Sequence, residues 1–199
     1  MGGVLVAGFV VFMIGASAWR LAYEQPLDTA LRVIHGDRRR RAWIHVWMLV
    51  AMFITPAGVA GVAALVDAPT ALVAAIAASL VYAIGAVCWI VSLAFRLAVV
   101  PWAAERAVAE GTPPGFAPLD GWAGALYVIH MASAYAASAV LGAALLAAGL
   151  TPGWVGWLGI AWGVAFLAGF VATRFSGPFN PPFWAHTYTA VVGVVLMAS

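Results

Sequence analysis

Long apolar runs dominate this chain and limit the folds that are open to it. An α-helix rises about 1.5 Å per residue, so roughly 20 apolar residues cross the ~30 Å hydrocarbon core of a bilayer. Six runs come close to that length, at residues 4–24, 42–66, 70–99, 119–149, 153–174 and 182–198. We therefore predict an all-α, polytopic membrane protein with six transmembrane helices in one compact bundle. Residues 1–199 are expected to form a single transmembrane helical domain.

The composition supports the same class. Hydrophobic residues make up 65% of the chain and charged residues 8%, against about a quarter charged in soluble domains. A soluble domain is therefore excluded. The first run has no basic residue before it, which a secretory signal requires, so we predict a transmembrane helix there. Cys88 is the only cysteine, which excludes an intramolecular disulfide.

The basic residues are nine arginines, without a single lysine. They fall in alternate connections or at the ends of the runs beside them, with Arg20, Arg32 and the arginines at 38–41 at the first, Arg96 and Arg106 at the third, and Arg174 at the fifth. The positive-inside rule then places these connections in the cytoplasm and both the N-terminus and the C-terminus outside a plasma membrane. Anionic lipid headgroups are the expected partners of these charges, at about 1 kcal/mol per basic residue, and no nucleic acid is expected.

The connections differ in length and composition. The short ones at 67–69 and 150–153 predict antiparallel neighbours for the helices on either side. Within residues 24–41, Leu27, Leu31 and Ile34 repeat at helical spacing, which predicts a short amphipathic surface helix. Residues 101–118 are rich in glycine and proline and predict a turn-rich loop.

Local signals predict helix starts and contacts. The side chains expected to cap helix N-termini are those of Asp67, Asp120, Thr151 and Asn180. Pro56 predicts a kink in its helix. The small-residue pair Gly159 and Gly163 predicts close contact with another helix, favoured within the chain. An arginine at the end of each inward run and a histidine early in each outward run favour three helical hairpins as one possible organisation.

Three histidines are the main candidates for chemistry. Counted from the outer helix ends, His45 and His130 lie at one depth, about 30 Å down, and His186 lies on the same cytoplasmic side. They are expected to ring the inner end of the bundle near Arg20, Arg96 and Arg174. Those three arginines predict either a shared site for an anion or lipid headgroup, or separate interfacial anchors.

Several interpretations of the histidines stay open. They can ligate the iron of haem b, with the arginines pairing the haem propionates. With Glu24 or Asp120 they can hold a catalytic zinc ion. They can also be hydrogen-bonded anchors at the interface beside tryptophan.

The sequence has no phosphate-binding, dinucleotide-binding, zinc-protease or nucleophile-elbow motif. This absence makes an enzymatic function less favoured. The lack of a carboxylate near the middle of a run likewise disfavours an active transporter. The favoured function is a non-catalytic binding or accessory subunit, with other membrane subunits as further partners. The alternative is a small b-type cytochrome that passes electrons at the cytoplasmic side, ahead of a metal-dependent membrane hydrolase or a transporter.

Overall fold

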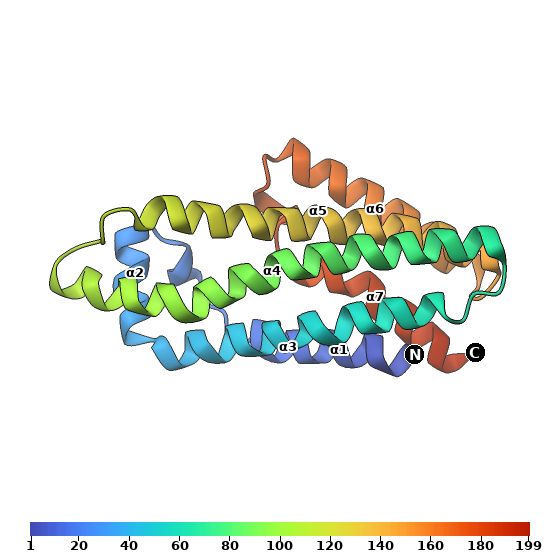
Figure 1. Cartoon of the computed structure of the whole chain (residues 1–199), viewed down its shortest axis with the longest axis horizontal. Helices are drawn as coiled ribbons and strands as arrows, with labels where there is room; N and C mark the ends of the chain where they lie inside the picture. The colour runs from blue at the N-terminus through green and yellow to red at the C-terminus, as the bar shows by residue number, and fades with distance from the viewer.

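A computed structural model describes residues 1–199 as an elongated bundle without strands, which confirms the all-α class. Its elements are α1 (Gly2–Ala16), η1 (Leu21–Glu24), α2 (Leu27–Gly36), α3 (Arg38–Ala63), α4 (Pro69–Ala109), α5 (Phe116–Ala148), α6 (Gly153–Ala172), η2 (Gly177–Phe179) and α7 (Phe183–Ala198). Both chain termini lie at one end of the bundle (Figure 1). The connection through α2 lies at the other end, which we call the arginine end.

Four helices, α3 to α6, are long and apolar enough to cross a membrane, as expected of a membrane protein. The apolar helices α1 and α7 have 15 and 16 residues, or about 23 Å each, which is less than the ~30 Å hydrocarbon core. The helices α4 and α5 have 41 and 33 residues, and α4 extends past the other helices at the arginine end (Figure 1).

The helices pack in the order α6, α5, α4, α3, α1, α7. The short connections make α3 and α4, and α5 and α6, neighbours as predicted. The last helix, α7, packs mainly on α1 and makes few contacts with α6, so the third of the expected hairpins does not form. At the α1–α7 contact, a Cβ on Gly2 would lie 2.4 Å from the carbonyl oxygen of Gly193, which shows how closely these helices approach.

The predicted loop at 101–118 is wrong over most of its length, because α4 continues through Pro101 to Ala109. On this extension α2 packs on α4, and the alanines of α4 that face the core there are Ala103, Ala104 and Ala107. The predicted amphipathic helix is confirmed as α2, with Leu31 and Ile34 buried. Packing of α2 on α4 thus extends the helix beyond the point where proline and glycine content favoured a loop.

The predicted caps are also wrong, because no helix N-terminus receives a side-chain hydrogen bond from its cap residue. Helix α5 begins at Phe116, before Asp120, and the Asp120 carboxylate pairs with Arg96 on α4. A partner in another helix has replaced the local backbone partner. The predicted glycine contact is confirmed within the chain, since a Cβ on Gly163 would lie 2.4 Å from the carbonyl oxygen of Tyr135 in α5.

Candidate functional site

A cavity of about 790 Å³ opens at the arginine end, between η1, α3, α4, α5 and the connection from α6 to α7. Its apolar walls are mainly aromatic, with Phe12, Trp89, Tyr127 and Phe183. Its charged and ionisable lining consists of Tyr23, Glu24, Arg41, His45, Arg96 and Asp120. The combination of aromatic walls and a few charged groups is typical of a site for a small organic ligand.

Arg41 is the most unusual residue of this lining. Only 7% of it is exposed, its Nη1 atom has no hydrogen-bond partner, and no carboxylate lies within ion-pair distance. Its guanidinium carbon lies 4.6 Å from the ring centre of Tyr23 and 5.2 Å from that of Trp19. These cation–π contacts hold the guanidinium in place without neutralising its charge.

Sequence reasoning treated the arginines at 38–41 as one topological signal and missed Arg41 as a site residue. The first three are exposed, but Arg41 begins the buried stripe of α3 that continues with Ile44, His45 and Met48. Spacings of three and four residues place these side chains on one helix face. This helical register was the sequence signal that could have identified Arg41 as a buried residue.

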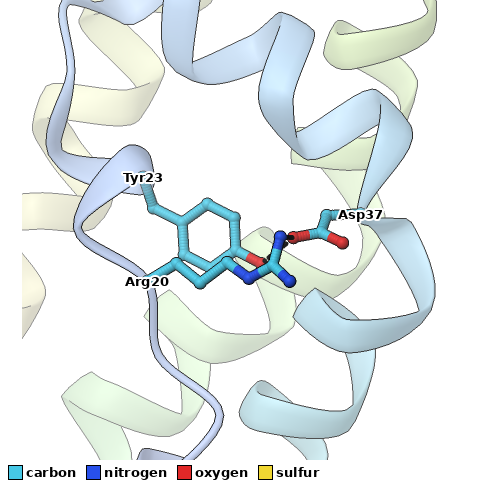
Figure 2. A network of polar contacts seen from close by, with 3 residues as sticks. All are labelled: Arg20, Tyr23 and Asp37. Atoms are coloured by element: carbon cyan, nitrogen blue, oxygen red, sulfur yellow. Dashed lines mark hydrogen bonds and ion pairs between the residues drawn. The ribbon is translucent and has the colours of Figure 1, made fainter.

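Tyr23 is positioned by a polar network at the junction of η1 and α3 (Figure 2). Its hydroxyl donates to Oδ2 of Asp37 at 2.8 Å, and Arg20 Nη1 donates to the same oxygen at 2.8 Å. Burial, together with the hydrogen bond to the Asp37 carboxylate and its charge, raises the pKa of Tyr23. The phenol beside Arg41 therefore stays neutral, and its hydrogen bond to Asp37 ties η1 to the start of α3.

The structure separates the three arginines that the sequence grouped. Arg96 lines the cavity and pairs with Asp120 across the α4–α5 contact. Arg20 pairs with Asp37 outside the lining, and Arg174 is exposed in the turn after α6, with a φ of 53°. Arg41 and Arg96, rather than the expected triad, therefore carry the positive charge of the site.

The structure brings two of the three histidines together. The ring centres of His130 and His186 are 6.3 Å apart, and both residues are completely buried. Thr55 Oγ1 lies 3.4 Å from His186 Nδ1, and Thr55 follows His45 by ten residues, so His45 lies roughly 15 Å along the helix from that pair.

His45 instead lines the cavity. Its Nδ1 lies 2.6 Å from the carbonyl oxygen of Arg41, to which it donates, and its Nε2 is left without a bond. No group of three or more His, Cys, Asp or Glu side chains is placed to hold a metal ion. The zinc interpretation therefore has no assembled ligand set: Glu24 accepts a hydrogen bond from the Trp19 indole, and Asp120 pairs with Arg96.

No family model, no curated protein and no solved structure matches this chain. The function is therefore inferred from the chemistry of the cavity and from the sequence.

Proposed function

We propose that the protein is an integral plasma-membrane protein that binds an amphipathic ligand bearing one anionic group in the cavity at the arginine end. It has no catalytic centre of its own and acts as a binding or accessory subunit, with other membrane subunits as partners. The single observation that carries the proposal is the buried Arg41 guanidinium, which has an unpaired Nη1 atom and no carboxylate partner.

An unpaired buried cation is costly, and a ligand carboxylate or phosphate offsets that cost. The two carboxylates of the lining are already engaged, Glu24 by the Trp19 indole and Asp120 by Arg96. A charge-assisted bond from Arg41 to the ligand is therefore the interaction that remains to be made. The aromatic walls of Phe12, Trp89 and Phe183 suit the hydrocarbon or ring portion of such a ligand.

The proposed topology has six passes, with the arginine end in the cytoplasm and both termini outside. The short helices α1 and α7 cross by local thinning of the bilayer, which costs fractions of a kcal/mol per ångström of mismatch. Gly36, at the end of α2, is exposed and has open space around it, so Gly36→Cys on a Cys88→Ser background is a suitable probe. We expect a membrane-impermeant thiol reagent to label it only after cell lysis, and labelling in intact cells contradicts the topology.

The binding test uses the full chain in mild detergent, with oleate and dioleoylphosphatidate as probes and dioleoylphosphatidylcholine as the zwitterionic control. Trp19 and Trp89 line the cavity, so tryptophan emission reports occupancy. Arg41→Gln is expected to weaken binding of one of the anionic probes about tenfold, equivalent to ~1.4 kcal/mol. Arg39→Gln, which alters an exposed arginine two residues away, is the matched control and is expected to change affinity less than about twofold. Equal losses in both variants indicate diffuse surface electrostatics and contradict the proposal.

The b-type cytochrome is retained as the second candidate because of His45. Its Nδ1 is bonded to the Arg41 carbonyl, which leaves Nε2 as the metal-binding nitrogen of the neutral ring, and Arg41 and Arg96 flank the same cavity. Haem carboxylates would then take the place of the anionic group. A visible absorption spectrum decides between them: a Soret band that His45→Gln abolishes supports the cytochrome, and a featureless spectrum supports the accessory subunit.

A further inference from the structure

A second cluster of polar side chains lies deeper in the bundle than the cavity and shares no polar residue with its lining. His130 comes from α5 and His186 from α7, while Thr55 of α3 and Tyr82 of α4 lie beside His186. Neither histidine lines the cavity, and both are completely buried. Four helices therefore deliver polar groups to one point in an otherwise apolar core.

Three ring nitrogens of this pair have no partner at hydrogen-bond distance and angle, although the backbone of Gly85 lies beside His130. They are His130 Nδ1, His130 Nε2 and His186 Nε2. A neutral imidazole has one N–H donor and one lone pair, and buried polar groups of this kind are nearly always satisfied. A bound ion or molecule would therefore supply the partner that these ring nitrogens lack.

The bonding of His186 indicates which of its nitrogens is available. Its Nδ1 lies 3.3 Å from the Tyr82 hydroxyl oxygen and 3.4 Å from that of Thr55. When Nδ1–H donates to these oxygens, the lone pair of the neutral ring resides on the unpaired Nε2. Metal-ligating histidines use this arrangement, in which the second nitrogen donates to an outer group and fixes the tautomer.

The spacing of the two rings fits one ion between them. Two nitrogen–metal bonds of about 2 Å each, plus the radii of the two rings, give a centre-to-centre distance of about 6 Å. The observed distance between the ring centres of His130 and His186 is 6.3 Å. The distance therefore matches that of two imidazoles bridged by one ion, whereas a porphyrin at the same point would meet the Trp89 and Phe12 rings that stack on the histidines at 4.5 Å.

We propose that His130 and His186 form a two-coordinate site for a monovalent d¹⁰ transition-metal ion, Cu(I). No third His, Cys, Asp or Glu is placed to join them, whereas structural Zn²⁺ takes four ligands. This core contains no carboxylate to offset a cation, so a singly charged ion costs less to bury there than a divalent one. Imidazole nitrogen is a suitable ligand for copper. A d¹⁰ Cu(I) ion accepts two nitrogen donors in a linear arrangement.

Two aromatic rings enclose the pair. Trp89 stacks on His130 and Phe12 stacks on His186, each with ring centres 4.5 Å apart. Their faces exclude water, and a nearby cation gains from the ring quadrupole. Both rings also line the cavity, so they separate the histidine pair from the arginine end. Binding of an ion at His130 therefore changes the surroundings of Trp89, which gives the experiment its optical signal.

The test uses the full-length protein in detergent under anaerobic conditions, titrated with Cu(I) against a chromophoric Cu(I) chelator, with tryptophan emission recorded in parallel. We expect one Cu(I) per chain, and we expect His130→Gln and His186→Gln each to weaken binding at least about tenfold. His35→Gln is the control, because His35 lies on α2 outside both sites and its loss is expected to leave Cu(I) affinity unchanged. Retained affinity in both pair variants, or an equal loss with His35→Gln, overturns the proposal.

X-ray absorption on the unmodified protein keeps the test independent of variant folding. A two-coordinate Cu(I) spectrum with nitrogen ligands supports the site. A three- or four-coordinate spectrum, Zn²⁺ binding as tight as Cu(I), or no stoichiometric binding overturns it. In the last case a buried water is the simplest bridge between the ring nitrogens.

Discussion

At the arginine end, polar contacts tie the helices together around an open cavity, whereas at the opposite end α5 and α6 meet through glycines with almost no charge nearby. All five ion pairs lie at the arginine end, and Asp67 is the only acidic or basic side chain near the other end. In the glycine contact, a Cβ on Gly142 would lie 2.5 Å from the carbonyl oxygen of Gly156. At this opposite end, which we call the glycine end, α5 and α6 are in backbone contact, whereas paired polar side chains line the cavity at the arginine end.

The contrast follows from what each kind of contact requires. Backbone-to-backbone packing in a membrane needs small residues and leaves no room for a ligand. Long side chains join different elements at the arginine end in the pairs Arg20–Asp37, Arg38–Glu105 and Arg96–Asp120, which are at most partly buried. Close contact between helix backbones stabilises the glycine end, whereas polar side chains line the cavity at the arginine end. Substitutions should therefore act differently at the two ends.

The largest effect is expected from Gly142→Ala, because the new methyl group would meet backbone atoms of α6 that cannot move independently. We expect a loss of about 1–3 kcal/mol in the free energy of unfolding, as for other overpacked contacts. Denaturation with sodium dodecyl sulfate from a mild detergent measures it. Gly121→Ala on the same helix is the matched control, since a Cβ there meets nothing within 4 Å.

The control should be neutral or stabilising by about 0.5–1 kcal/mol, because alanine is the better helix former. If the two variants lose stability equally, the glycine end is not closed by backbone contact. The comparison between the two ends then fails.

A smaller effect is expected from Asp120→Asn, which leaves Arg96 unpaired between α4 and α5. The two side chains are 25% and 29% exposed, so solvent screens the pair only in part. A loss of about 1 kcal/mol is expected, between the values for exposed and buried pairs. Glu105→Gln breaks the more exposed pair with Arg38 and is expected to cost less than about 0.5 kcal/mol. A reversed order contradicts the view that the partly buried Arg96–Asp120 pair stabilises the bundle more than the exposed Arg38–Glu105 pair does.

The smallest effect concerns Asp28, which accepts hydrogen bonds from Arg32 at 3.1 Å and from Thr112 at 3.1 Å. Hydrogen bonds from Arg32 and then Thr112 hold the pKa of Asp28 below its usual range. Because the folded pKa is depressed, this contact contributes above the ordinary carboxyl range and is lost as the pH falls below about 4.

Amide exchange around Thr112, corrected for the intrinsic rate, should therefore increase at low pH in the unmodified protein. In Asp28→Asn it should be raised at neutral pH and show little further dependence on pH. If exchange is identical in the two proteins, Asp28 does not stabilise the loop between α4 and α5. The polar contacts of the arginine end then do not extend beyond α2.

Much of this organisation could be predicted locally. The spacing of Leu27, Leu31 and Ile34 identified α2, because an amphipathic period needs no knowledge of the partner helix. The pair of Gly159 and Gly163 likewise predicted a close contact within the chain. Local signals failed where a distant partner competed: Asp120 looks like a cap but pairs with Arg96, and Pro101 looks like a breaker but lies inside α4.

The site shows the same division. The sequence named His45, His130 and His186 as candidates, but not that two of them meet while the third lines a separate cavity. It also gave Arg41 the same weight as the exposed arginines beside it. The rotation of each helix about its own axis decides both points, and that rotation is set by packing against neighbours.

The sequence by itself determined that this is an all-helical chain with membrane-length apolar helices, because hydropathy over 20 residues is a property of the segment alone. It also determined that the arginines gather near alternate ends of these segments. Only the tertiary structure decided that α7 returns to α1, that α4 runs past Pro101, and that one of four consecutive arginines is buried without a counter-ion. These outcomes depend on contacts between residues far apart in the chain, and no local pattern encodes which of the competing partners lies within reach.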